Sequence, residues 1–148
     1  MKNFIKWAVL GLASVLAMPV MAQVTPNRVT TCVIPAVVAA NTTSNVTSTA
    51  VSVPQGKGLS FIPTFQATGA SLSNAVFRFQ VSADGTTYTT TTPLTLTVVQ
   101  NGTTTVTGWA LWDPTELNHV AWIKLVSVQT DHGTQALTNM SAVYVTSN

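Results

Sequence analysis

The sequence predicts an all-β protein, built as a single antiparallel β-sandwich of about seven or eight strands. From Ser48 onward, apolar and polar residues alternate with a period of two, which is typical of strands with one buried face. Asp84-Gly85 and Asn101-Gly102 mark turns between such segments. No helical period appears after residue 22. Together these observations favour a sandwich over any helical or mixed fold.

Residues 1–22 are predicted to be a secretory signal peptide. Two lysines precede an apolar run over residues 7–18, and small residues lead up to Ala22. A retained membrane anchor would need about 20 apolar residues, and this run is shorter and is followed by Pro19. We therefore expect cleavage after Ala22 and a secreted or cell-surface location, a virion surface included, with no membrane contact after cleavage.

Removal of this leader makes the chain electrically neutral. The sequence has six Lys and Arg against four Asp and Glu. Lys2 and Lys6 lie in the leader, so six minus two leaves four basic residues against four acidic ones. A neutral chain lacks the basic stripe that follows a phosphate backbone, so we expect no nucleic-acid partner. Low net charge also weakens repulsion between copies, which favours self-association.

Residues 23–47 are predicted to form an extended N-terminal arm ahead of a β-sandwich domain over residues 48–148. The apolar segment 33–40 is interrupted by Pro35, which cannot donate to a strand ladder and suits an edge strand or strap. The single cysteine excludes an intrachain disulfide and is expected to be either buried or paired between chains, burial being favoured. The residues assigned to the assembly arm are Cys32, Val33, Ile34, Val37 and Val38.

The first strands of the sandwich are predicted from their alternation. Residues 51–53 and 59–64 alternate in this way and are separated by a Pro- and Gly-containing break. In residues 75–82, Phe77, Phe79 and Val81 share one face and polar side chains the other. Asp84-Gly85 then predicts a tight hairpin turn.

A threonine-rich, uncharged stretch over residues 86–105 supplies the next pair of strands. In residues 92–99, three apolar side chains point one way and Thr95, Thr97 and Val99 the other. Asn101-Gly102 is a strong hairpin signal, so residues 103–109 are expected to return beside this strand. Threonine favours the extended backbone, but a long uncharged face is also prone to pairing with another chain.

The last third of the domain is predicted to hold one turn and two strands. Residues 113–116 read as a single helical turn closed by a capping box between Asp113 and Glu116. Residues 119–130 form a strand that is apolar on both faces, with Val128 expected on the face of Trp122, which indicates a central strand or a second outer partner. Residues 131–133 turn the chain, and residues 136–146 supply the final strand.

The segment from Phe77 to Tyr88, Phe-Arg-Phe-Gln-Val-Ser-Ala-Asp-Gly-Thr-Thr-Tyr, followed by Val-Ala-Trp-Ile-Lys-Leu at 120–125, carries a family resemblance. It resembles the immunoglobulin-like and jelly-roll modules of bacteriophage virions and bacterial surface proteins. The resemblance implies a role in display or assembly and transfers no catalytic residue. The secretion leader fits a cell-surface protein better than an ordinary capsid protein.

No motif for catalysis or cofactor binding is present, so we expect a protein that is not an enzyme and needs no cofactor. Asp113, Glu116 and His119 have a spacing that a metal site can use, but the capping box already explains the two carboxylates. His132 is too far along the chain to join His119, because 13 extended residues span roughly 40 Å. We therefore expect no metal site.

Aromatic side chains suggest a ligand-binding surface instead. Trp109 and Trp112 have opposite parity on a straight strand, so one of them is expected in the core. Trp122 shares a predicted face with Lys124, and Tyr88 lies in the threonine-rich stretch. Sugar rings stack their C–H faces on such aromatic rings. The residues proposed for ligand binding are Tyr88, Trp122 and Lys124, although Trp122 is expected more readily to pack against a neighbouring sheet.

Two functions follow from these observations. The first is an exported, non-enzymatic structural subunit whose partners are copies of itself, assembled into a surface layer, filament or virion exterior. In this hypothesis the arm adds a strand to the edge of a neighbouring subunit. The second is a carbohydrate-binding or adhesive surface module whose partners are surface glycans.

Overall fold

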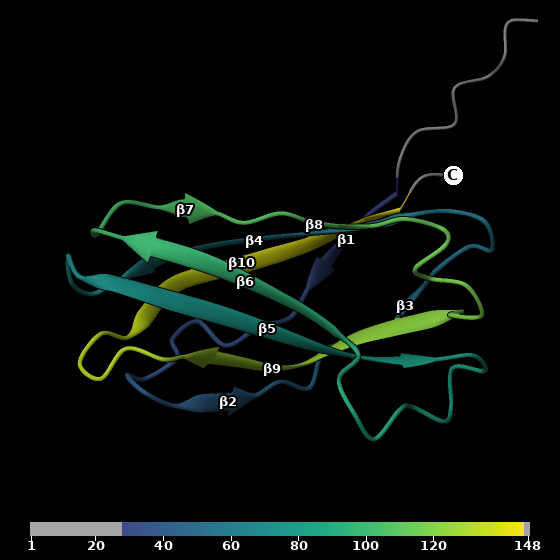
Figure 1. Ribbon diagram of the computed structural model, residues 1–148, viewed down its shortest axis with the longest axis horizontal. Helices are drawn as coiled ribbons and strands as arrows, with labels where there is room; N and C mark the ends of the chain where they lie inside the picture. The colour runs from purple at the N-terminus through teal and green to yellow at the C-terminus, as the bar shows by residue number, and fades with distance from the viewer. Residues whose placement is uncertain (1–27, 147–148) are drawn as a thin grey trace, which may run out of the picture.

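The computed structural model describes residues 28–146 as two antiparallel β-sheets packed face to face, with no helix among these residues (Figure 1). The predicted signal peptide and the arm residues 23–27 lie outside this described range. The strands are β1 (Arg28–Cys32), β2 (Thr43–Asn45), β3 (Val51–Ser52), β4 (Leu59–Ala67), β5 (Leu72–Ser82), β6 (Leu94–Asn101), β7 (Val106–Thr107), β8 (Ala110–Trp112), β9 (Trp122–Thr130) and β10 (Leu137–Thr146). The predicted all-β sandwich is confirmed.

The strands are connected with jelly-roll topology. Sheet A has the order β1-β10-β4-β7, with β8 also on β4, and sheet B has the order β2-β9-β5-β6, with β3 also on β9. β2 and β3 both pair with the same edge of β9, and β7 and β8 both pair with the same edge of β4. Each of these two pairs counts as one strand position, so the ten strands occupy eight positions in the two sheets. Successive positions alternate between the sheets, except for the β5–β6 pair. An immunoglobulin domain would place its first two strands side by side, whereas β1 and β2 lie in different sheets.

The core lies between the sheets and is centred on aromatic rings. The Phe61 ring from β4 has its centroid 5.5 Å from that of Phe77, 4.8 Å from that of Phe79 and 5.2 Å from that of Tyr144. All four side chains are fully buried. The alternation in β4 and β5 therefore places its apolar face inward, as the sequence predicts.

Residues 28–47, predicted to belong to an extended arm, are built into the sandwich. β1 runs antiparallel to β10 from Arg28↔Thr146 to Cys32↔Ala142. Val38 is fully buried and bridges Leu137, and β2 pairs with β9. The physical reason is that β10 and β9 would otherwise present open edges, which this segment covers. The boundary predicted at residue 48 does not divide these residues from the domain.

Two predicted tight hairpins are replaced by longer connections. Asp84-Gly85 does turn the chain, but β5 and β6 are paired only as far as Phe79↔Leu94, so the hairpin loop is long. After Asn101-Gly102 the chain crosses to the other sheet, where β7 pairs with β4 instead of returning beside β6. The segment after Asn101-Gly102 thus pairs with the edge of β4 in the other sheet and does not form a hairpin with β6.

The strand predicted over residues 119–130 is shorter, central and bulged. β9 lies between β5 and the edge strands β2 and β3, which confirms the predicted central position. A register shift places Arg78 opposite Ser127 and Phe79 opposite Leu125, so Val126 is an extra residue. The bulge reverses the alternation, and Val128 is fully buried in the core rather than on the outer face of Trp122.

Candidate functional site

The loop over residues 83–93 folds back over the outer face of sheet B. Its first turn is held by Asp84, whose Oδ1 accepts hydrogen bonds from the backbone N–H groups of Thr87 at 2.7 Å and Thr86 at 2.8 Å, and from Ser82 Oγ at 2.8 Å. These donors, with the backbone N–H of Thr87 foremost, hold the pKa of the Asp84 carboxyl well below its usual range. The hydrogen bonds to Asp84 therefore hold this turn in place without any ligand.

Two contacts from β9 fasten this loop, and they involve all three residues predicted to bind ligand. The Trp122 indole lies so close to Gly85 that a Cβ at that position would meet Trp122 Nε1 at 2.8 Å. Lys124 Nζ lies 3.8 Å from the centroid of the Tyr88 ring, a cation–π contact. Tyr88, Trp122 and Lys124 are thus neighbours, but Trp122 packs against the chain itself rather than standing clear of it.

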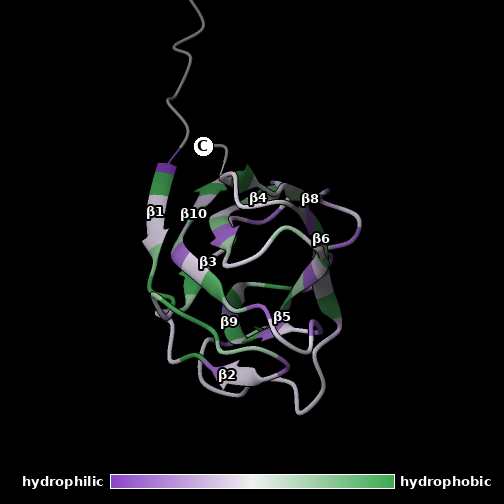
Figure 2. Ribbon diagram, turned by 90° about the vertical axis from the view of Figure 1, so that its left-hand side faces the viewer, coloured by the Kyte–Doolittle hydropathy of each residue, from purple (hydrophilic) through white to green (hydrophobic). Residues whose placement is uncertain are grey.

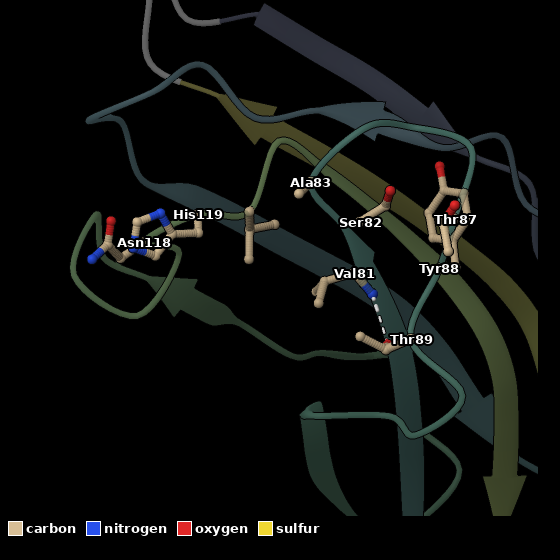
Figure 3. Close-up of a pocket in the computed structure, with 9 residues that line it drawn as sticks. Val81, Ser82, Ala83, Thr87, Tyr88, Thr89, Asn118 and His119 are labelled. Atoms are coloured by element: carbon tan, nitrogen blue, oxygen red, sulfur yellow. Dashed lines mark hydrogen bonds between the residues drawn. The ribbon is translucent and has the colours of Figure 1, made fainter.

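A groove of about 410 Å³ opens beside the loop (Figure 3). Figure 3 shows Asn118 and His119 on one side, Thr87 and Tyr88 on the other, and the end of β5 with Ala83 between them. The remaining lining residues are Val81, Ser82, Thr89 and Val120. The site therefore joins one aromatic ring, an amide, an imidazole and several hydroxyls.

The turn before β9 positions the far wall of the groove. Asp113 Oδ1 accepts hydrogen bonds from the N–H groups of Thr115 at 2.7 Å and Glu116 at 3.0 Å, while Glu116 Oε2 accepts one from the N–H of Asp113 at 3.0 Å. This is the predicted capping box. His119 ends the turn with φ of +68°, a conformation that non-glycine residues seldom adopt.

Within residues 28–146, no three His, Cys, Asp or Glu side chains are grouped closely enough to hold a metal ion. His119 and His132 lie beyond opposite ends of β9. Burial raises the pKa of the Cys32 thiol to about 11, so the thiolate needed for reactivity is scarce near neutral pH.

The residues assigned to the assembly arm are divided between the core and the surface. Cys32 and Val38 are buried, and Ile34 is partly buried against the core. Val33 and Val37 are 62% and 55% exposed. The five residues therefore do not form one continuous plug.

Sequence reasoning missed an uncharged outer face on sheet A. The register aligns Val29, Val145, Ser60 and Leu111 in one row across the sheet. Val29 and Leu111 are strongly exposed, as is Trp109 just before β8. Trp112 instead lies in the core with its ring centroid 4.9 Å from that of Phe79, which confirms the predicted split of the two tryptophans.

Figure 2 shows the two sheets end-on, with β1, β10, β4 and β8 along one side of the sandwich. Among the strands of sheet A, Arg28 is the single charged residue, at the start of β1. A row of this kind can be identified only when the register between strands is known. The alternation within each segment does not reveal which outer residues become neighbours.

No helix in the described range has the length and hydropathy required to span a bilayer. A scan of the chain against models of known protein families found no match, and neither did a search of curated proteins.

Proposed function

We propose that this chain is an exported, non-enzymatic structural subunit whose copies associate through the outer face of sheet A. The observation that carries the proposal is the row formed by Val29, Val145, Ser60 and Leu111, with Trp109 close by and no charged side chain on the face between them. Exposed apolar patches bordered by polar residues mark interaction surfaces.

A second copy of the chain is the occupant that suits this face. An uncharged face meets its own copy without burying an unpaired charge, which would cost several kcal/mol per ion. Threonine and serine hydroxyls elsewhere on the strands of sheet A, such as those of Thr31, Ser141 and Thr64, can bond to groups of the partner copy or to trapped water. A partner with a charged surface would gain nothing from this face.

The size of the face sets the expected strength of association. Four strand positions at about 4.8 Å spacing and about eight residues at 3.3 Å each give a face of roughly 500 Å². Two copies would then bury roughly 1,000 Å², at the lower end for specific interfaces. A single contact should therefore be weak, and a stable layer or filament would depend on repeated contacts.

In this proposal β1 stays on its own β10 and contributes Val29 to the contact. The alternative mechanism is the arm hypothesis, in which β1 leaves its edge position and pairs with β10 of a neighbour. Because β1 has a partner on one side alone, such an exchange would replace the same ladder bonds between copies. The two mechanisms predict different responses to substitution on the outer face.

Sedimentation velocity over a concentration series tests the proposal with the exported protein. The triple variant Val29→Thr/Trp109→Thr/Leu111→Thr should remain monomeric at concentrations where the parent associates. The matched control Leu72→Thr/Val99→Thr removes exposed apolar groups from sheet B and should associate like the parent. A parent that stays monomeric at every concentration would overturn the proposal, and association that survives the triple substitution would favour strand exchange.

A further inference from the structure

The groove beside Tyr88 is a second feature of the surface that the assembly proposal does not use. Its volume of about 410 Å³ lies within the range of small-molecule sites, roughly 300–1,000 Å³. A second hollow of about 270 Å³ adjoins it and shares Ala83, His119 and Val120 with it. The two hollows together form a continuous concave surface at one end of the sandwich.

His119 stands where the two hollows meet, in a strained backbone conformation. Its φ of +68° falls in the left-handed region, which L-residues with a side chain rarely adopt because the Cβ crowds the following carbonyl oxygen. The turn could be closed by glycine without this crowding. A strained residue that persists at a concave surface is an observation from which a functional hypothesis can start.

The polar groups of the groove fall into two sets. The hydroxyls of Ser82 and Thr89 are engaged within the chain, donating to Asp84 Oδ1 and to the Thr91 carbonyl. In the described residues, the side chains of Thr87, Asn118 and His119 form no hydrogen bond with another group. The groove therefore presents uncommitted donors and acceptors on both sides of its floor, as Figure 3 shows.

We infer that this groove binds a neutral sugar ring, the terminal residue of a glycan. One edge or face of the sugar would lie against the Tyr88 ring, and its hydroxyls would exchange hydrogen bonds with Asn118, His119 and Thr87. Val81, Ala83 and Val120 supply the apolar floor against which the C–H groups of the ring pack. This inference does not depend on self-association through sheet A.

The charges around the groove favour a neutral ligand. No Asp, Glu, Lys or Arg lines it. The nearest acid, Asp84, is occupied by the backbone N–H groups of its own turn, and Lys124 is placed over the Tyr88 ring. Burial, assisted by the Asp84 charge, raises the pKa of the Tyr88 hydroxyl, so that hydroxyl keeps its proton and can donate. A phosphate or carboxylate would find no lysine or arginine among the lining residues, and Lys124 already contacts the Tyr88 ring.

Saturation-transfer NMR with the exported protein tests the inference, using a panel of methyl glycosides. The neutral probes are methyl glucoside, galactoside, mannoside and N-acetylglucosaminide, and the charged comparators are methyl glucuronide and sialic acid. At least one neutral probe should receive saturation from the protein. In amide spectra of the isotope-labelled protein, the same probe should shift the backbone signals of Asn118, His119 and Tyr88. The charged comparators should do neither.

Variants then locate the site, and His119→Gly is the one that leaves the contacts of the loop in place. His119→Gly removes the imidazole while relieving the positive φ, so its stability should not fall, yet it should weaken binding about tenfold, the loss expected for one hydrogen bond to the ligand. Tyr88→Ala should abolish binding, whereas Tyr88→Phe should keep most of it. Thr97→Ala, a hydroxyl deletion on β6, serves as the control and should bind like the parent.

The inference is overturned if no neutral glycoside binds, if a charged comparator binds instead, or if the shifted amides lie outside the groove. It is also overturned if His119→Gly and Tyr88→Ala both bind as the parent does. The melting temperature of His119→Gly should match that of the parent. A loss of binding in this variant is then due to the missing imidazole and not to unfolding.

Discussion

The ammonium nitrogen of Lys124 lies 3.8 Å from the centre of the Tyr88 ring, although Lys124 belongs to β9 and Tyr88 to the loop after β5. The contact holds the loop over residues 83–93 against the outer face of sheet B. Tyr88 also lines the groove. The same residue pair therefore fastens the loop and shapes the groove wall.

Replacing Lys124 by Ala should lower the free energy of unfolding by about 0.5–1 kcal/mol, the value of an exposed cation–π contact. Lys124→Arg keeps the cation over the ring and is the matched control. Urea denaturation followed by tryptophan fluorescence gives both values. Equal losses for the two variants would show that the cation does not stabilise the loop.

Gly85 should be intolerant of a side chain for two separable reasons. Its φ is +78°, and a Cβ would meet Trp122 Nε1 at 2.8 Å. Gly56 has a similar φ of +71° but nothing within 4 Å of its Cβ position. Gly56→Ala should therefore cost only the backbone strain, about 1 kcal/mol, and Gly85→Ala about 1–3 kcal/mol more through overpacking.

Thermal unfolding of the two glycine variants measures this difference. If Gly85→Ala and Gly56→Ala lose equal stability, the indole must move away at no cost, and the loop is not packed as described. A selective loss at Gly85 would instead show that Trp122 serves as a structural clamp.

Gly108 packs closely against Val98 of the opposite sheet, so we expect it not to tolerate a side chain. A Cβ on Gly108 would clash with Val98 Cγ2, and the Gly108 N–H donates to the Pro63 carbonyl at 2.8 Å. Gly108→Ala should cost about 1–3 kcal/mol. Adding Val98→Ala should recover part of that loss, because it removes the methyl group that clashes.

A double-mutant cycle on Gly108 and Val98 gives the coupling directly. The expected result is a double variant more stable than the sum of the single losses allows. Simple additivity would contradict the contact.

The sequence identified the strands better than it identified their neighbours. The alternation in β4 and β5 is a local property, because successive side chains on a strand face opposite sides whatever the fold. The Asn101-Gly102 hairpin failed for a long-range reason: the edge of β4 accepts β7, and Gln100 Nε2 holds the turn by donating to the carbonyls of Gly102 and Thr104 at 2.7 Å each.

The same distinction applies to the candidate site. The capping box was predictable because its three hydrogen bonds join residues within four positions of one another. The groove was not, since it depends on the left-handed backbone of His119 and on a loop that folds back from β5. The bulge at Val126 was hidden for the same reason, as an extra residue shows only against a paired strand.

Asp84 should make stability depend on pH in the acid range. Its folded pKa is lowered by the N–H groups of Thr87 and Thr86, so the unfolded chain, with a carboxyl pKa of about 3.9, takes up the proton first. The stabilisation is then fully present above about pH 4 and is lost as the pH falls toward the folded pKa. Asp84→Ala should melt lower than the parent at pH 7.

The melting temperatures of Asp84→Ala and the parent should converge below about pH 4. High salt should leave the difference at pH 7 nearly unchanged, because hydrogen bonds rather than distant charges cause it. A gap that stays constant down to pH 2 would contradict the assignment.

Cys32 should be inert in the folded protein and should not link subunits. The side chain is buried, β1 and β10 are paired through Cys32↔Ala142, and burial raises the thiol pKa to about 11. Since the thiolate is the reactive form, labelling by iodoacetamide at pH 7.5 should be negligible in buffer and complete in concentrated urea. Non-reducing electrophoresis should show no disulfide dimer. A disulfide dimer in freshly exported protein, or rapid labelling without denaturant, would mean that β1 leaves β10 readily, which is what strand exchange between copies requires.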